Sequence, residues 1–199
     1  NVGEYRYPLG GKLYVFNKNE NIGFIKGHMC SPAIATQAED LIAGGVKELI
    51  HVGYAGGLQP ELVPGEIILT DGAFNDTAVA RVYGYDYDII HSSKDLTNEI
   101  EEMITSAEIL YKRGFHWTTD AGYRETWGQV MDYRDKGALC VEMEGVGLFT
   151  IANYRKCVAT GIYVVSDVYL EDDWKLGWEG NDIKKAVGEI IDMIIKSIR

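Results

Sequence analysis

The chain has 199 residues, of which 46% are hydrophobic, and its formal net charge is −11. This length is typical of one compact domain with a substantial core, so we expect a single domain over residues 1–199. The acidic balance argues against a nucleic-acid partner, which needs a Lys/Arg-rich face. No apolar run reaches the roughly 20 residues of a membrane span, and no signal-peptide pattern opens the chain. The first residue is Asn1, close to an expected strand, which leaves room for an N-terminal segment outside this sequence.

Three cysteines, Cys30, Cys140 and Cys157, are widely spaced and form no CxxC pattern. A disulfide framework uses paired cysteines in an oxidising compartment. We therefore interpret them as reduced thiols and expect a cytoplasmic protein.

The first elements are two short strands, predicted over residues 12–16 and 22–26 from their apolar and aromatic content. A helix follows, because Ser31-Pro32 supplies an N-cap and a proline at the first helical position. Apolar residues then recur at helical spacing until Gly44-Gly45.

Further strands are predicted over residues 48–53 and 66–70, which are short, apolar and β-branched. The first of them runs into a glycine-rich turn at residues 53–57. A long helix is predicted over residues 94–113 from an apolar stripe that ends at Leu110.

The last part of the chain predicts a strand over residues 115–119, a helix over 125–135, a helix ending near Tyr154, an apolar strand over 158–165 and a closing helix from Asp182. Strands that alternate with helices imply a three-layer α/β/α sandwich around one central sheet. In such sheets, ligands bind at the carboxyl ends of strands, where loops and helix N-termini converge.

Two carboxylates, Glu142 and Glu144, flank Met143 in an apolar run just before a predicted helix. One interpretation is a strand edge with two solvated glutamates. The other is that one glutamate accepts hydrogen bonds from a hydroxylated ligand, since two carboxylate oxygens suit a vicinal diol such as that of ribose.

Asp167 ends the apolar strand over residues 158–165, and a protonated Asp there could donate to a leaving-group nitrogen as a general acid. The alternative is an N-cap for a following turn. The glycine turn at residues 53–57 has neither GxGxxG nor GxxxxGK[ST] spacing, which argues against a dinucleotide or P-loop site.

Other site chemistries find no matching pattern. The chain has no GxSxG nucleophile motif, and its histidines (residues 28, 51, 91 and 116) have no HExxH or other metal spacing. We therefore expect no metal.

Three segments, in this order, resemble the nucleoside phosphorylase and nucleosidase superfamily, which includes hexameric purine nucleoside phosphorylases, uridine phosphorylases and methylthioadenosine nucleosidases. The Val-Glu-Met-Glu of residues 141–144 looks like the family's ribose motif, and the Val-Ser-Asp of 165–167 looks like the segment with its purine-directed acid. The Val-Gly-Tyr-Ala-Gly-Gly of 52–57 is similar to its glycine turn. The resemblance runs from about Arg6 to the final helix and implies the family's α/β/α fold around a mixed sheet.

Carried over to this sequence, the resemblance implies that Glu144 accepts the ribose 2′ and 3′ hydroxyls, Met143 packs against the sugar and Asp167 protonates N7 of a departing purine. The remaining candidate substrate-binding residues are Glu142, Ala55, Gly56, Tyr123, Ser166 and His28. Arg6 resembles an arginine that reaches the phosphate of a neighbouring subunit, which implies a homo-oligomer, either a dimer or a trimer of dimers. Phosphate enters as co-substrate, and no cofactor is implied.

The departures from the family pattern concern phosphate above all. His51 stands where phosphorylases usually carry arginine, and Tyr54 stands where they carry Thr or Ser. The base-stacking aromatic falls at Gly122, which leaves Tyr123 as its substitute. The arginine expected after the acid is absent, with Lys175 as the nearest cation.

Three functions follow: cleavage of a purine-type nucleoside with phosphate as acceptor, the same cleavage with water, or a non-catalytic nucleoside-binding or storage protein. Asp167 favours purines, because the uridine-directed members generally lack an acid there. Family frequency favours phosphate, so the sequence predicts a pentosyltransferase of the nucleoside phosphorylase type.

Overall fold

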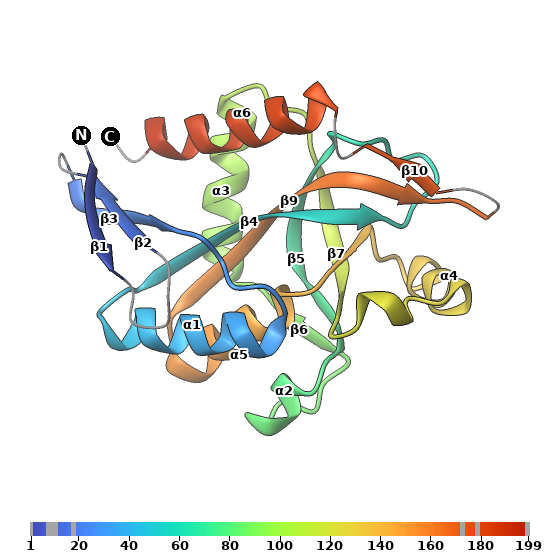
Figure 1. Cartoon of the computed structure of the whole chain (residues 1–199), viewed down its shortest axis with the longest axis horizontal. Helices are drawn as coiled ribbons and strands as arrows, with labels where there is room; N and C mark the ends of the chain where they lie inside the picture. Colours follow the sequence, from blue (N-terminus) through green and yellow to red (C-terminus); the bar gives the residue numbers. More distant parts are fainter. Residues whose placement is uncertain (1, 7–11, 17–18, 172–173, 178–179, 198–199) are drawn as a thin grey trace.

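The computed structural model of the chain describes residues 2–6, 12–16, 19–171, 174–177 and 180–197 (Figure 1). Its strands are β1 (Val2–Arg6), β2 (Lys12–Phe16), β3 (Asn19–Ile25), β4 (Glu48–Gly57), β5 (Ile67–Asp76), β6 (Ile89–His91), β7 (Lys112–Thr119), β8 (Cys140–Glu142), β9 (Val158–Tyr169) and β10 (Trp174–Leu176). Its helices are α1 (Ser31–Ala43), α2 (Val79–Val82), α3 (Lys94–Ser106), the 3-10 turn η1 (Gly122–Arg124), α4 (Trp127–Asp135), α5 (Gly145–Arg155) and α6 (Asn181–Ser197).

The central sheet is mixed and has the strand order β10-β9-β4-β8-β7-β5-β6. The pairs β4–β9, β5–β7 and β7–β8 are parallel, whereas β4–β8, β5–β6 and β9–β10 are antiparallel. The start of β5 also pairs with β9, Ile67 to Leu69 against Val164 to Ile162. The strands β9, β4, β8, β7 and β5 therefore close into a ring. A separate antiparallel sheet holds β1, β2 and β3.

Helices cover the central sheet on both sides (Figure 1). On one side α1, α2 and α5 pack together in an apolar cluster that includes Ile34, Ala38, Val146 and Phe149. On the other side α3 and α6 pack on β5 and β9 through a second apolar cluster. This arrangement confirms the predicted α/β/α fold, and it follows from the apolar stripe that each helix must bury.

Several predicted boundaries were wrong. Residues 53–57 are strand rather than turn, because the end of β4 pairs with both β9 and β8. The helix predicted over residues 94–113 ends at Ser106, since Glu108 adopts a left-handed φ of 55° that no helix can continue through. Leu110 belongs to the following loop, where its side chain is 92% exposed.

The short elements β6, β8, β10 and α2 were not predicted. Each has three or four residues, which is too few to show an apolar period. Two of them shape the candidate site, because β8 carries Glu142 and β10 covers the end of β9.

Candidate active site

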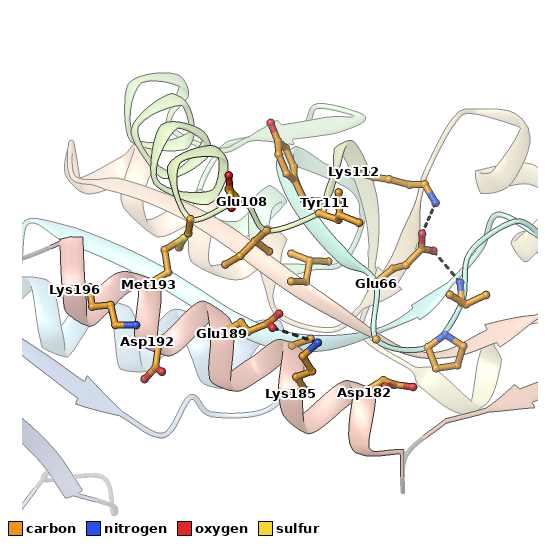
Figure 2. Close-up of a pocket in the computed structure, with 18 residues that line it drawn as sticks. Glu66, Glu108, Tyr111, Lys112, Asp182, Lys185, Glu189, Asp192, Met193 and Lys196 are labelled. Carbon is orange, nitrogen blue, oxygen red and sulfur yellow. Dashed lines mark hydrogen bonds and ion pairs between the residues drawn. The ribbon is translucent and has the colours of Figure 1, made fainter.

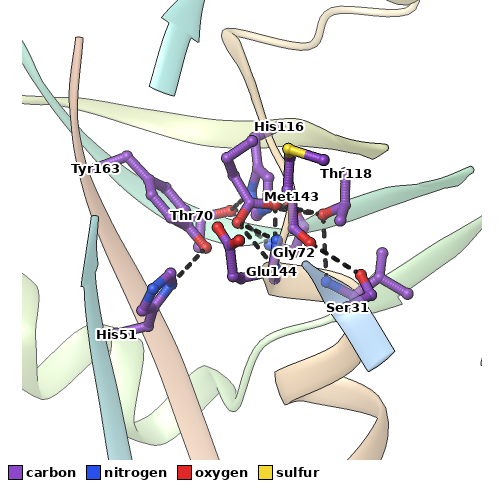
Figure 3. A network of polar contacts seen from close by, with 12 residues as sticks. Ser31, His51, Thr70, Gly72, His116, Thr118, Met143, Glu144 and Tyr163 are labelled. Carbon is purple, nitrogen blue, oxygen red and sulfur yellow. Dashed lines mark hydrogen bonds and ion pairs between the residues drawn. The ribbon is translucent and has the colours of Figure 1, made fainter. Parts of the chain in front are cut away.

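The segment between β8 and α5 carries Met143 and Glu144, and the start of α1 is bound to it. The backbone N–H of Cys30 donates to Oε1 of Glu144 over 2.6 Å. The Ser31 hydroxyl donates to the Met143 carbonyl over 3.1 Å (Figure 3). Cys30 has a φ of 74°, a conformation that costs a non-glycine residue about 1–3 kcal/mol. Strain of this kind persists only where surrounding contacts impose it, as they do here at the Glu144 carboxylate.

Glu142 is buried beneath this segment, and both of its oxygens are hydrogen-bonded inside the protein. Oε2 accepts the backbone N–H groups of Glu144 and Gly145, each over 2.8 Å. Oε1 accepts from the Thr118 hydroxyl over 2.5 Å and lies 3.1 Å from Nε2 of His116. The carboxylate thus caps the N-terminus of α5, where the helix dipole favours an anion, and it fixes the backbone that carries Glu144.

His116 joins Glu142 to Thr70 in the interior. The Thr70 hydroxyl donates to the Gly72 carbonyl over 2.8 Å and lies 2.6 Å from Nδ1 of His116 (Figure 3). Nε2 of His116 lies 3.1 Å from Oε1 of the Glu142 carboxylate. Both ring nitrogens therefore have a buried polar partner, and the imidazole joins the two sides of this interior network.

Opposing effects act on the two glutamates. Burial alone would raise the pKa of Glu142, but the charge and hydrogen bond of His116, with His51 and Thr118, hold that pKa below its ordinary value. Burial and the charge of Glu142 raise the pKa of Glu144 to about 7, although backbone hydrogen bonds lower it. Glu142 is therefore a fixed anion, whereas Glu144 titrates near neutral pH.

The residues that stand where phosphorylases hold phosphate do not lie together. His51 is turned inward, with Nδ1 3.4 Å from the Tyr163 hydroxyl. Burial lowers its pKa more than the charge of Glu142 raises it, so the imidazole is neutral at pH 7. Tyr54 is 48% exposed. It is three residues from His51 on β4, and side chains three residues apart on a strand project from opposite faces of the sheet. The side chain of Arg6 lies outside the described part of the structure.

Asp167 lies near the end of β9 and is 3% exposed. Its Oδ1 accepts from the Ser166 hydroxyl over 2.5 Å, and its Oδ2 accepts from the indole N–H of Trp174 over 2.6 Å. The Ser166 hydroxyl also lies 3.2 Å from the Ala55 carbonyl. The hairpin of β9 and β10 thus covers the candidate acid with the protein's own donors.

Gly56 connects the two halves of the site. It pairs with Asp167 on one side and with Val141, the neighbour of Glu142, on the other. A side-chain Cβ at this position would lie 3.3 Å from Oδ2 of Asp167, 3.3 Å from Val141 and 2.8 Å from the Tyr169 ring. Glycine is therefore required there, and the segment carrying Glu144 and the strand carrying Asp167 flank the same point of β4.

The last two candidate substrate-binding residues are His28 and Tyr123. The backbone N–H of His28 donates to the Gln37 side chain over 3.0 Å. Tyr123 is fully exposed on η1. Its neighbour Gly122 lies closer to the sugar-directed Met143, because a Cβ added at Gly122 would lie 3.7 Å from the Met143 sulfur.

Sequence reasoning missed His116 and Thr118 as partners of Glu142, and Trp174 as the partner of Asp167. Alternation along the predicted strand over residues 115–119 puts His116 and Thr118 on one face, which was the available signal. The sequence offered no comparable signal for Trp174.

A groove lies apart from this site. It has a volume of about 750 Å³ and runs between α6 and the segments around Glu66 and Tyr111 (Figure 2). Two ion pairs line it, Lys112 with Glu66 over 2.8 Å and Lys185 with Glu189 over 3.6 Å. It includes none of the candidate site residues.

Two further findings concern the described residues alone. They contain no group of three or more His, Cys, Asp or Glu side chains arranged to hold a metal ion. No helix among them is long and apolar enough to span a membrane.

The fold and site define an α/β protein that gathers carboxylates at the ends of β8 and β9, the two strands on either side of β4, an arrangement typical of small-ligand sites. The family model of the phosphorylase superfamily matches residues 1–196, so the chain belongs to that superfamily.

Relatives of known name agree. The chain is 33% identical to a DeoD-type purine nucleoside phosphorylase of Exiguobacterium sibiricum over 139 residues, which are 68% of this chain and 59% of the relative. It is 32% identical to one of Caldanaerobacter subterraneus over 156 residues, 73% of this chain and 67% of the relative. The chain thus spans about three fifths to two thirds of the length of these curated relatives.

A solved structure shares the fold. The Toxoplasma gondii purine nucleoside phosphorylase in complex with immucillin-H matches with a TM-score of 0.88 and 19% identity, over 99% of this chain and 81% of that one. At this identity the likeness establishes the fold alone.

Proposed function

We propose that the chain cleaves the N-glycosidic bond of a purine-type nucleoside with phosphate as acceptor, releasing the free base and ribose 1-phosphate. This is the activity of a pentosyltransferase. The observation that carries the proposal is the approach of the Glu144 segment and of Asp167 to the two sides of Gly56. Membership of the phosphorylase superfamily and the names of the relatives support it.

Glu144 serves as the ribose ligand. Its Oε1 already accepts from Cys30, so the carboxylate is oriented before substrate arrives. Cleavage gives the sugar oxocarbenium character, and an anion beside it stabilises that charge more in the transition state than in the ground state. Met143 packs against the sugar. Glu142 acts through the backbone that it fixes, as a positioning residue.

Asp167 serves as the acid that protonates N7 of the leaving base, with Ala55, Gly56 and Ser166 around it. A carboxylate can give a proton only from its neutral form. The indole N–H of Trp174 donates to Oδ2 and so fixes the orientation of the Asp167 carboxyl group. Each carboxyl oxygen can have more than one hydrogen-bonding partner, so the base can approach while this contact remains.

Water is the alternative acceptor, and one observation favours it. A neutral His51 and an exposed Tyr54 make a poorer phosphate site than the permanent positive charge of arginine. A non-catalytic nucleoside-binding protein of the same fold is the third function.

The remaining assignments belong to the same proposal. Phosphate is the co-substrate, and no cofactor takes part. Arg6 of one copy completes the site of a neighbouring copy, in a dimer or a trimer of dimers. The three free cysteines support a cytoplasmic protein. We assign the whole chain, residues 1–199, to one domain, in keeping with its length.

Release of free base from inosine, adenosine, methylthioadenosine and uridine, with and without phosphate, tests the proposal. We expect release from purine nucleosides only when phosphate is present. Equal release without phosphate would select hydrolysis, and binding without release would select the non-catalytic function.

A further inference from the structure

Arg134, near the end of α4, binds two backbone carbonyls that belong to different strand ends. Its Nε donates to the carbonyl of Leu58 over 2.5 Å, and its Nη2 donates to the carbonyl of Tyr169 over 2.8 Å. Leu58 directly follows β4, and Tyr169 is the last residue of β9. One guanidinium group thus joins the end of β4 to the end of β9.

These two carbonyls lie just beyond the candidate acid. Gly56 pairs with Asp167, and the parallel pairing of β4 with β9 ends one residue further on. Leu58 and Tyr169 are each two residues beyond this pair. The guanidinium of Arg134 therefore continues the connection between the strands where direct pairing stops.

The helix α4 holds Arg134 in place for this contact. Its guanidinium carbon lies 5.3 Å from the centre of the Trp127 ring, and Nη1 lies 3.6 Å from the sulfur of Met131. Trp127, Met131 and Arg134 are spaced by four and three residues, so they share one face of the helix. The carbonyl of Arg134 also accepts from the side chain of Gln59 over 3.3 Å. The guanidinium is therefore oriented from its own helix as well as by the carbonyls.

The end of β9 has little freedom to move without moving the acid. A Cβ at Gly56 would lie 2.8 Å from the Tyr169 ring and 3.3 Å from Oδ2 of Asp167, so these groups are closely packed. Tyr169 also stacks on Trp174, with ring centroids 6.0 Å apart, and the Trp174 indole donates to Asp167. A displacement of Tyr169 would therefore reach Asp167 through both the strand and the indole.

We propose that Arg134 is a positioning residue, which sets the geometry of Asp167 by clamping the ends of β4 and β9. The inference rests on the proposed nucleoside cleavage, in which Asp167 protonates N7 of the leaving base. Arg134 acts through the backbone of Leu58 and Tyr169. A misplacement of about 1 Å can cost about 10²-fold in rate, so a small loosening of this clamp is sufficient to slow the reaction.

Lysine is the informative substitution at this position. It keeps the positive charge, but its single nitrogen lacks the planar fork with which arginine donates in two fixed directions. Leu58 is fully buried, so a carbonyl that loses its donor there is not readily satisfied by water. Arg134→Lys should therefore release at least one strand end.

The test compares a substrate that needs the acid with one that does not. In 7-methylinosine, N7 carries a methyl group and the ring is cationic, so the base leaves as a neutral molecule without taking a proton. We expect Arg134→Lys to lower kcat for inosine by about 10-fold or more, with KM changed by no more than about 3-fold. Its kcat for 7-methylinosine should stay within about 3-fold of wild type. An equal fall for both substrates, or no fall for inosine, would overturn the inference.

Two further variants sharpen the comparison. Arg134→Met removes both donors, so it should give a larger loss for inosine with the same difference between the two substrates. Arg81→Lys, at an exposed position of α2, is the matched control and should leave both rates unchanged. A loss confined to inosine in Arg81→Lys would also contradict the assignment.

Hydrogen exchange separates this inference from the proposed function. The backbone amides of residues 165–169 should exchange about 5- to 10-fold faster in Arg134→Lys, because a lost hydrogen bond lets the strand end open more often. Arg81→Lys should keep wild-type exchange rates. If the wild-type chain cleaves no nucleoside, the proposed function fails while hydrogen exchange still decides on Arg134. Unchanged exchange in Arg134→Lys would refute its role as a clamp.

Discussion

The backbone N–H of Cys30 donates to Oε1 of Glu144 over 2.6 Å, across 114 positions of sequence. This contact ties the start of α1 to the carboxylate that we assign to the ribose. It coincides with a positive φ at Cys30 and with the close packing of α1 on α5. The conformation of Glu144 therefore depends on a helix that contributes no candidate catalytic group.

The raised pKa of Glu144 predicts a pH-dependent stability. The folded protein holds this proton up to about pH 7, whereas an unfolded Glu has the model value of 4.5. The free energy of unfolding should therefore fall as the pH rises through this window. The glutamine of Glu144→Gln has no proton to lose, so its free energy of unfolding should not fall in this way. In urea titrations, the stability of Glu144→Gln relative to wild type should therefore increase between pH 4.5 and pH 7. Glu99→Gln, at an exposed position of α3, should show no such trend, and parallel curves for Glu144→Gln and wild type would contradict the assigned environment.

Two helical glycines should respond to alanine in opposite directions. A Cβ at Gly147 would lie 2.5 Å from the Ser31 carbonyl oxygen, so Gly147→Ala forces α5 away from α1 and should cost about 1–3 kcal/mol. It should also slow turnover, because Ser31 adjoins Cys30. Gly188 in α6 has no atom within 4 Å of its Cβ position, so Gly188→Ala should stabilise by about 0.5–1 kcal/mol. Thermal unfolding measures both, and a stable Gly147→Ala would argue against this helix contact.

The buried pair of His116 and Glu142 should be strongly coupled. Glu142→Gln disturbs the buried hydrogen bonds that this carboxylate accepts from His116, Thr118 and the backbone, so it should cost about 3–5 kcal/mol of unfolding free energy. With His116→Gln, a double-mutant cycle should give a coupling above about 1 kcal/mol. The exposed pair of Lys136 and Asp132 is the control, with an expected coupling of at most about 0.5 kcal/mol. Additive effects at His116 and Glu142 would mean that the two side chains do not interact.

Trp174 should hold the candidate acid in position. Trp174→Phe keeps the aromatic stack on Tyr169 but removes the indole N–H that donates to Oδ2 of Asp167. We expect kcat/KM for purine nucleosides to fall by about 10-fold, a typical effect of losing a hydrogen bond to a charged group. Glu99→Gln, at an exposed position of α3, is the control and should leave kcat/KM unchanged. An unchanged kcat/KM in Trp174→Phe would show that the indole does not position the acid.

Local sequence patterns predicted most of the architecture. The apolar periods located the main helices and strands, and the alternation of strands with helices gave the layers. The pairing of β5 with β9 was not predictable, because it joins residues 67–69 to residues 162–164 and depends on how the whole sheet curls. The error at residues 107–113 arose because Leu110 extends an apolar stripe that the backbone has already left.

The candidate site was predicted only in part. Glu144 and Asp167 were visible from their motifs, and the structure brings their segments to Gly56. The motif could not distinguish Glu142 from Glu144, because the difference depends on His116 and Thr118, which β7 brings alongside β8. Trp174 lies on a strand of three exposed residues, so only the hairpin geometry reveals its contact with Asp167.

Turnover of purine nucleosides by Glu144→Gln and Asp167→Asn, beside the wild-type chain in saturating phosphate, tests the central claim most directly. Each substitution keeps the size of the side chain while removing a charge at the sugar or a proton for the base. We predict that each lowers kcat by about 10²-fold or more, as acid–base and electrostatic groups typically do. Wild-type rates in both variants would contradict the assignment of this pair as the catalytic residues.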